Sequence, residues 1–255
     1  MGAAVRVPAT VRRIVSLVPS LTESVAATLP GALVGATDWC SHPPGLDVTR
    51  VRGTKNPDLD AIRRLRPDVV LANAEENREP DIAALREAGL AVWVTRIETL
   101  DGAFASLERM FRHACRTGRP GWLERAERVW RAPAPPPGGH RPATGPRRTA
   151  VVPIWRRPWM VVGRDTFTGD VLARLGVDNL YAGHAERYPR VPLPELVGRS
   201  PDLVVLPDEP YAFSAADGPE CFPGLRCVLV SGRDLTWYGP SLVAARARLE
   251  SALAR

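Results

Sequence analysis

Short apolar runs alternate along this chain with segments of helical character, and this alternation is the feature that most constrains the fold. Residues 13–18, 69–72 and 90–95 are apolar runs with the length of buried strands. Helical segments of about ten residues separate them, and this spacing is typical of βαβ units, whose strands lie parallel in one sheet. The sequence therefore predicts an α/β fold with mainly parallel sheets.

Local signals give expected boundaries for the first helices. Ser20 and Glu23 form a capping-box pattern, which predicts a helix with Ser20 as its N-cap that continues to about residue 29. A second helix is expected over 56–66, where it meets a proline. Residues 38–44 contain two adjacent prolines and are therefore predicted to be a loop.

The second half of the chain repeats the alternation. Strands are predicted over 149–155, 159–162, 203–206 and 228–230, and helices over 168–175 and 240–254. Residues 64–72 and 198–206 also share one pattern, in which a helix end is followed by Pro-Asp and an apolar strand. This similarity predicts two lobes of related design. Pro-Asp before a strand is common in α/β proteins, however, so the pattern alone leaves a chance resemblance open.

A long helical stretch, residues 100–130, is expected between the two halves. Apolar residues such as Leu107 and Met110 recur there at the spacing of one helix face, and residues 119–121 are expected to kink or split the stretch. Residues 132–146 are rich in proline and glycine, which predicts a loop or extended linker. The expected organisation is an α/β lobe over 11–98, a stiff connecting helix with a Pro-rich linker over 99–147, and a second α/β lobe over 148–255.

Charge and composition argue against several classes of protein. The net charge is +6, but the basic residues are mostly scattered arginines, with Lys55 as the only lysine. No dense basic run interleaves with aromatic residues, so we expect no nucleic-acid partner. Since no apolar stretch of about 18 residues occurs, we expect a chain that is not embedded in a membrane.

The N-terminus and the cysteines bear on where the protein works. Residues 1–13 lack the apolar core of a secretory signal peptide, so the expected location is cytoplasmic, or extracytoplasmic if the start site is misannotated. The spacing of the four cysteines matches no zinc module. Cys221 and Cys227 are close enough in sequence to form a disulfide in an exported protein; otherwise we expect free thiols.

Several segments, taken in order, resemble one protein family. They are residues 13–23, 39–44, 53–60, 66–72, 167–179, 191–194, 200–205 and 230–234. Together they resemble the cobalamin and iron-chelate substrate-binding proteins of bacterial ABC importers, of the helical backbone metal receptor type. The resemblance implies two Rossmann-like lobes joined by a long helix, as in class III periplasmic binding proteins, with a ligand cleft between the lobes.

The same resemblance implies non-catalytic, reversible binding of a metal chelate, with cobalamin or another corrinoid as the first candidate. It implies a monomer that requires no cofactor and has an importer permease as its partner. The alternatives are a siderophore or haem-type iron chelate as ligand, and a cytoplasmic metal-handling protein or enzyme that reuses the fold. Glu75 and Glu76 would suit acid–base catalysis, but a solvated helix start is the simpler interpretation. No nucleophile-elbow or phosphate-loop motif occurs to support an enzyme.

The expected ligand-binding residues follow strands or open helices at the edge of each lobe. Helix N-termini near Ser20 and Thr168 present free N–H groups, which favour polar or anionic ligand atoms by roughly 0.3–1 kcal/mol each. Flat side chains are expected to cover a macrocycle, because each buried aromatic ring removes roughly 150–250 Å² from water. The full set is Ser20, Trp39, His42, Asn73, Asn77, Trp155, Phe167, Asp234, Trp237 and Tyr238.

The chain also departs from the pattern of the family it resembles. The tryptophans that flank the corrin in that family fall near Thr54 and Lys55 and at Leu193, and none of these residues is tryptophan. Of the two surface acids that dock onto a permease, Asp60 keeps the charge, whereas Arg199 stands close to the second position. The identity of the chelate therefore stays open.

A bare metal site is the sharpest alternative for the loop that follows the strand expected over 33–37. Asp38, Cys40 and His42 crowd this loop, and their side chains would converge on an ion if a residue such as His184 or Asp234 joined them. The competing interpretations are a loop that lines the ligand cleft and a loop that merely lies at the surface. We expect the cleft-lining role and no metal ligands.

Overall fold

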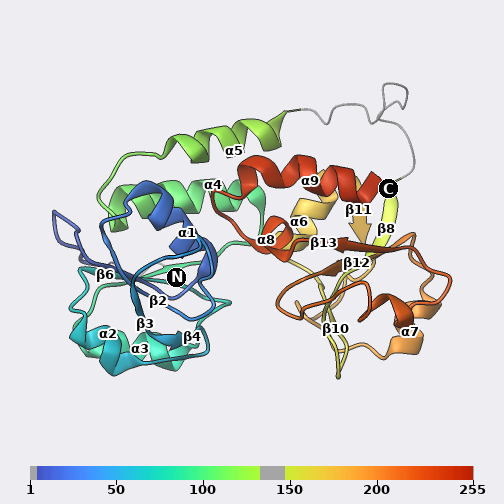
Figure 1. Ribbon diagram of the computed structural model, residues 1–255, viewed down its shortest axis with the longest axis horizontal. Helices are drawn as coiled ribbons and strands as arrows, with labels where there is room; N and C mark the ends of the chain where they lie inside the picture. Colours follow the sequence, from blue (N-terminus) through green and yellow to red (C-terminus); the bar gives the residue numbers. More distant parts are fainter. Residues whose placement is uncertain (1–4, 133–146, 255) are drawn as a thin grey trace. The chain divides into compact units, whose positions relative to one another are not determined.

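The computed structural model describes residues 5–132 and 147–254, and the chain divides into two compact units (Figure 1). Unit 1 comprises residues 1–97, 101–127 and 238–240, and unit 2 comprises residues 98–100, 128–237 and 241–255. Each unit contains its own sheet of parallel strands, which confirms the predicted α/β class. Most of the Pro-rich stretch predicted as a linker, residues 133–146, lies outside the described residues.

The sheet of unit 1 has the strand order β3-β2-β1-β6-β7, and all of its pairs are parallel. Its strands are β1 (Ile14–Ser16), β2 (Leu33–Ala36), β3 (Thr49–Arg50), β6 (Val69–Asn73) and β7 (Val92–Thr95). The helices α1 (Pro19–Thr28), α2 (Leu59–Arg64) and α3 (Glu79–Glu87) connect them, and β4 (Arg52–Gly53) and β5 (Asn56–Pro57) form a short antiparallel hairpin. Every residue of β1 and β6 is buried, as expected for central strands that are covered on both faces.

Two predicted helix starts are wrong by a few residues. Helix α1 begins at Pro19 with Val18 as its N-cap, and no side chain caps it, so Ser20 lies in the first turn instead of at the cap. Proline suits this position because its φ is already helical and its missing N–H would have no partner there. Helix α2 begins after Asp58, whose carboxylate accepts a 2.8 Å hydrogen bond from the Ala61 N–H. The residues predicted to open it belong to β5, which pairs with β4.

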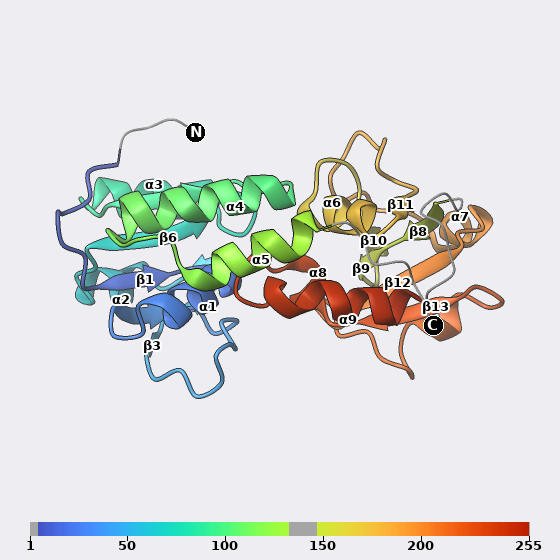
Figure 2. The ribbon, with the colours of Figure 1, turned by 90° about the horizontal axis from the view of Figure 1, so that it is seen from above.

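The predicted long helical stretch is interrupted. It consists of α4 (Leu100–Arg109), a wider π-helical turn η1 (Met110–Ala114) and α5 (Gly121–Arg131). Within unit 1, the start of α5 lies beside η1, because the Trp122 ring packs edge-on against Phe111 with 6.0 Å between the ring centroids (Figure 2). The break at residues 119–121 is therefore a split, one of the two outcomes expected from the sequence.

The sheet of unit 2 has the order β11-β8-β12-β13 and is also parallel. Its strands are β8 (Arg148–Val151), β11 (Val177–Asn179), β12 (Leu203–Pro207) and β13 (Cys227–Val230), and its helices are α6 (Phe167–Arg174), α7 (Leu193–Gly198), α8 (Gly232–Thr236) and α9 (Leu242–Ala254). The predicted strand 149–155 is two strands, because β9 (Pro153–Trp155) leaves the sheet and pairs antiparallel with β10 (Met160–Val161). No helix in the described ranges is long and apolar enough to cross a membrane.

Candidate functional site

The carboxyl ends of parallel strands meet at one edge of a sheet, and the loops at this edge carry most of the predicted ligand-binding residues. In unit 1, α1 with Ser20 follows β1, the Trp39 loop follows β2, and Asn73 ends β6. In unit 2, Asp234 lies in α8, directly after β13. Ligands of open α/β sheets bind at this edge, which makes it the candidate site in each unit.

Asn73 holds the loop that follows β6. Its side-chain oxygen accepts hydrogen bonds from the N–H groups of Glu75 at 2.8 Å and Glu76 at 3.3 Å, and its amide nitrogen donates to the Thr95 hydroxyl at 3.1 Å. Asn73 is buried, so these bonds satisfy polar atoms that water does not reach. Asn73 thus shapes the edge of the sheet through its neighbours.

Asn77 joins three segments at the same edge. Its amide nitrogen donates to the Leu17 carbonyl at 3.2 Å and the Thr54 carbonyl at 3.0 Å, and its oxygen accepts from the Asn73 N–H at 2.9 Å. These bonds connect the end of β1, the tip of the β4–β5 hairpin and the end of β6. The side-chain polar atoms of Asn77 therefore bond to backbone groups of the protein itself.

Tyr238 and Gly239 return to unit 1 from the far end of the sequence. A Cβ atom on Gly239 would lie 3.0 Å from the Ser20 carbonyl oxygen and 3.1 Å from the Ser24 hydroxyl, so glycine allows this segment to rest on α1. Burial raises the pKa of the Tyr238 phenol, and the Glu76 carboxylate raises it further. The phenol is consequently neutral, and the predicted residues Ser20 and Tyr238 lie in the same part of unit 1.

The Trp39 loop carries one exposed ring and one buried thiol. Trp39 is 68% exposed, whereas Cys40 is fully buried with its sulfur 2.9 Å from the Thr22 hydroxyl and 3.1 Å from the Thr37 hydroxyl. Burial raises the pKa of the Cys40 thiol, which keeps it protonated. His42 is half-buried, and its Nδ1 lies 3.1 Å from the Ser41 hydroxyl.

Within the described residues, no group of three or more His, Cys, Asp or Glu side chains could hold a metal ion. Of the three residues that the bare-metal alternative invoked in this loop, Cys40 is fully buried, with its sulfur beside the hydroxyls of Thr22 and Thr37. The arrangement of the Trp39 loop therefore gives no support to the bare-metal alternative.

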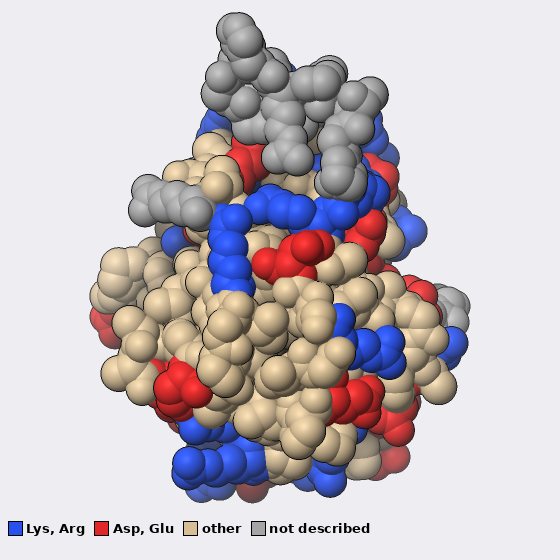
Figure 3. Space-filling model, turned by 90° about the vertical axis from the view of Figure 1, so that its right-hand side faces the viewer, with Lys and Arg blue, Asp and Glu red and all other residues tan. Residues whose placement is uncertain are grey.

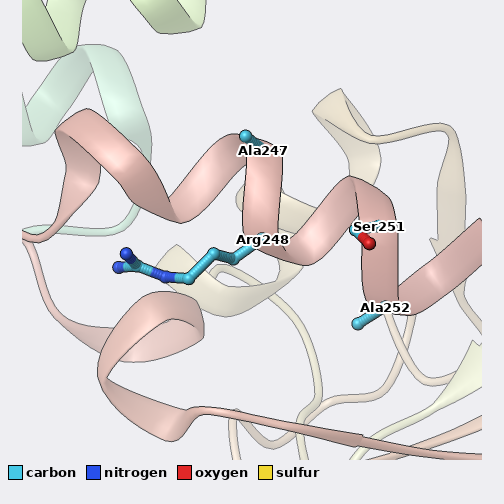
Figure 4. A pocket seen from close by; sticks show the side chains of 4 residues that line it. All are labelled: Ala247, Arg248, Ser251 and Ala252. Carbon is cyan, nitrogen blue, oxygen red and sulfur yellow. The ribbon is translucent and has the colours of Figure 1, made fainter.

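In unit 2, the buried carboxylate of Asp234 forms an ion pair with Arg248, whose side chain is half exposed. Both of its carboxylate oxygens accept hydrogen bonds from Arg248 of α9, from Nε and Nη2 at 2.5 Å each. Figure 4 shows Arg248 projecting from α9 beside a surface hollow that it lines with Ala247, Ser251 and Ala252. Trp237 is buried as well, and the Arg233 guanidinium lies 5.9 Å from the centre of its ring.

Trp155 and Phe167 complete the predicted set in unit 2. Trp155, at the end of β9, is 43% exposed and packs edge-on against Tyr211 with 5.7 Å between ring centroids. Phe167 is buried in the first turn of α6, whose N-cap Thr166 accepts a 3.2 Å hydrogen bond from the Gly169 N–H. Tyr211, which packs against Trp155, lies in the loop that follows β12.

Charge on unit 2 is mixed in sign where it can be seen. On the face drawn in Figure 3, acidic and basic side chains lie close together and a broad part of the face carries neither. Oppositely charged side chains of unit 2 also pair with one another, as Arg147 does with Asp178 at 2.7 Å.

Comparison with known proteins identifies relatives of similar sequence. The vitamin B12-binding protein of Vibrio cholerae is 23% identical to this chain over 199 residues, which cover 77% of this chain and 71% of the relative. The resemblance predicted from the sequence is confirmed. No family model matches the chain.

Solved structures agree with this likeness. Periplasmic vitamin B12-binding protein BtuF of Vibrio cholerae superposes with a TM-score of 0.76 at 18% identity, covering 96% of this chain and 97% of that one. Periplasmic haem-binding protein BhuT, in complex with two haems, gives a TM-score of 0.77 at 24% identity, covering 95% and 97%. The chain thus has the two-lobed α/β fold of class III periplasmic binding proteins.

Proposed function

We propose that this chain binds a metal chelate without transforming it, with cobalamin or another corrinoid as the first candidate. The observation that carries the proposal is the exposure of one tryptophan in each unit: Trp39 is 68% exposed and Trp155 is 43% exposed. Each follows a strand of the main sheet of its unit, β2 for Trp39 and β8 for Trp155. Ligand pockets are lined mostly by apolar and aromatic side chains, so exposed indole rings suit a ligand-binding surface. A flat macrocycle suits indole rings because both have broad apolar faces.

The remaining predicted residues divide into contact and support. We assign contact with the ligand to Trp39, His42 and Trp155, which are partly or largely exposed. Support is assigned to the buried members, which fix the loops around the ligand. They are Ser20, Asn73, Asn77, Phe167, Asp234, Trp237 and Tyr238. That the edges of both sheets contact one ligand remains a prediction of the sequence analysis.

Haem is the second candidate ligand. Structural neighbours include a haem-binding protein of Pseudomonas aeruginosa with a TM-score of 0.76, besides BhuT. Haem and corrinoids are both flat chelates of tetrapyrrole size, so the same exposed rings would serve either. The proposed role is that of the substrate-binding component of an ABC importer, with a permease as its partner and a location outside the cytoplasm, as in the periplasmic relatives.

Titration of the purified chain with aquocobalamin, haemin and a ferric siderophore tests this proposal. We expect a shifted absorption band and a raised melting temperature with at least one of them at micromolar concentration. Trp39→Ala should weaken that binding at least about tenfold, a loss of about 1.4 kcal/mol. Leu229→Ala removes another exposed apolar side chain and should leave binding unchanged. Binding of zinc or manganese ions alone, with no chelate bound, would contradict the proposal.

A further inference from the structure

Lys55 is a feature of unit 1 that the proposed function does not use. It is the only lysine among 34 basic residues, and it lies at the exposed tip of the β4–β5 hairpin. A lysine ammonium is a compact charge with three donors that can turn toward a partner, whereas arginine presents a fixed planar fork. The hairpin tip therefore offers a group that occurs nowhere else in the chain.

Two hydrogen bonds hold this tip at the carboxyl edge of the sheet. The Asn77 amide nitrogen donates to the Thr54 carbonyl at 3.0 Å, and the Lys55 ammonium donates to the Glu75 carbonyl at 2.5 Å. Trp39 borders the same hairpin, since its indole nitrogen lies 3.3 Å from where a Cβ on Gly53 would stand. The exposed ring and the ammonium thus belong to one small part of the edge.

The ammonium has donors left for a ligand. Its one hydrogen bond in the structure goes to the Glu75 carbonyl, and no described carboxylate lies within ion-pair distance, 4.0 Å, of its nitrogen. Two of its three N–H groups therefore face solvent or a ligand.

Two acidic residues that follow β6, Glu75 and Glu76, bear on the charge that Lys55 presents. Burial raises the pKa of the Glu76 carboxyl, while Lys55 lowers it and Glu75 raises it. The net shift of the Glu76 pKa is upward, with burial as its largest cause. Glu75 contacts Lys55 through its backbone carbonyl.

We infer that Lys55 binds an anionic substituent on the rim of the chelate and makes the site selective for chelates with free carboxylates. A ring stacked on Trp39 would bring its rim toward the hairpin tip, where an ammonium–carboxylate hydrogen bond is stronger than one to a neutral amide or ester. This inference rests on the proposed function and narrows it: among the proposed chelates, it favours haem and corrinoids with free carboxylates over cobalamin, whose ring side chains are amides.

The test compares each acid with its own ester: haemin with haemin dimethyl ester, and dicyanocobyrinic acid with its heptamethyl ester. Dissociation constants are measured for the full chain, for Lys55→Gln and Lys55→Arg, and for Arg86→Gln as a control at an exposed basic residue at the end of α3. For at least one pair, the unmodified chain should bind the acid more tightly. Lys55→Gln should weaken binding of that acid about tenfold and leave the ester unchanged, and added salt should narrow the difference. Lys55→Arg should retain much of the preference, and Arg86→Gln all of it.

The outcomes separate this inference from the proposed function. If the unmodified chain binds acid and ester alike, or if Lys55→Gln weakens both alike, chelate binding stands and the role of Lys55 as a carboxylate-binding residue is wrong. If the unmodified chain binds no chelate at all, the proposed function fails and the inference fails with it.

Discussion

At the scale of single residues, Asn77 is expected to matter for stability because it satisfies backbone groups in three segments. Asn77→Ala would leave the carbonyls of Leu17 and Thr54 and the N–H of Asn73 without their present partner. Unsatisfied buried groups cost about 1–3 kcal/mol, so we expect a loss of that size in the free energy of unfolding, measured by urea denaturation. Glu87→Ala, at an exposed position of α3, should change it by less than about 0.5 kcal/mol. An Asn77→Ala chain as stable as this control would contradict the role assigned to Asn77.

Glu220 provides a prediction about pH. The hydrogen bond from Arg156 lowers the pKa of its carboxyl from 4.5 to about 2. A carboxyl whose pKa is lower in the folded state stabilises the fold above its unfolded pKa, and this contribution is lost as the pH falls toward the folded value. We therefore expect the stability difference between the native chain and Glu220→Gln to shrink as the pH falls from about 4.5 to about 2. Urea midpoints measured across this window provide the check, and a difference independent of pH would contradict the pairing.

At the scale of elements, the Tyr238–Pro240 segment depends on a close approach to α1. Gly239→Ala would place a Cβ 3.0 Å from the Ser20 carbonyl oxygen, closer than nearly all such contacts, so the segment must shift. We expect a net loss of about 1 kcal/mol in stability. Gly198→Ala meets no atom within 4 Å and has no positive φ, so it should leave stability unchanged or raise it. Thermal denaturation of both variants checks this, and a shift in the same direction for both would contradict the close contact.

The elements that the sequence predicted well are those with strong local signals. The run Val69–Ala72 is apolar throughout, and it forms all of β6 except the last residue, as expected. The β4–β5 hairpin was missed because strands of two residues carry no periodic pattern, and its pairing displaced the predicted start of α2. Ser20 was misplaced as an N-cap because the proline before it is itself a good first helical residue.

The candidate site shows the same limit. Asn73 and Asn77 were predicted because they follow an expected strand. Their hydrogen bonds to Thr95 and Thr54, in contrast, depend on the three-dimensional arrangement of neighbouring loops. Burial of Asp234 against Arg248 was equally invisible, because 14 residues separate them in the sequence. Sequence position thus indicated the edge of the sheet, while the division of the predicted residues into exposed and buried ones required the structure.

At the scale of the whole molecule, the central proposal is that both units serve one ligand, as predicted from the sequence. Calorimetric titration of the full chain with the chelate that binds best tests it most directly, carried out in parallel on Trp39→Ala and Trp155→Ala. The account predicts one chelate per chain and a single binding step that either substitution weakens at least about tenfold. Two independent steps, each lost with a different tryptophan, or a step that neither substitution changes, would contradict it.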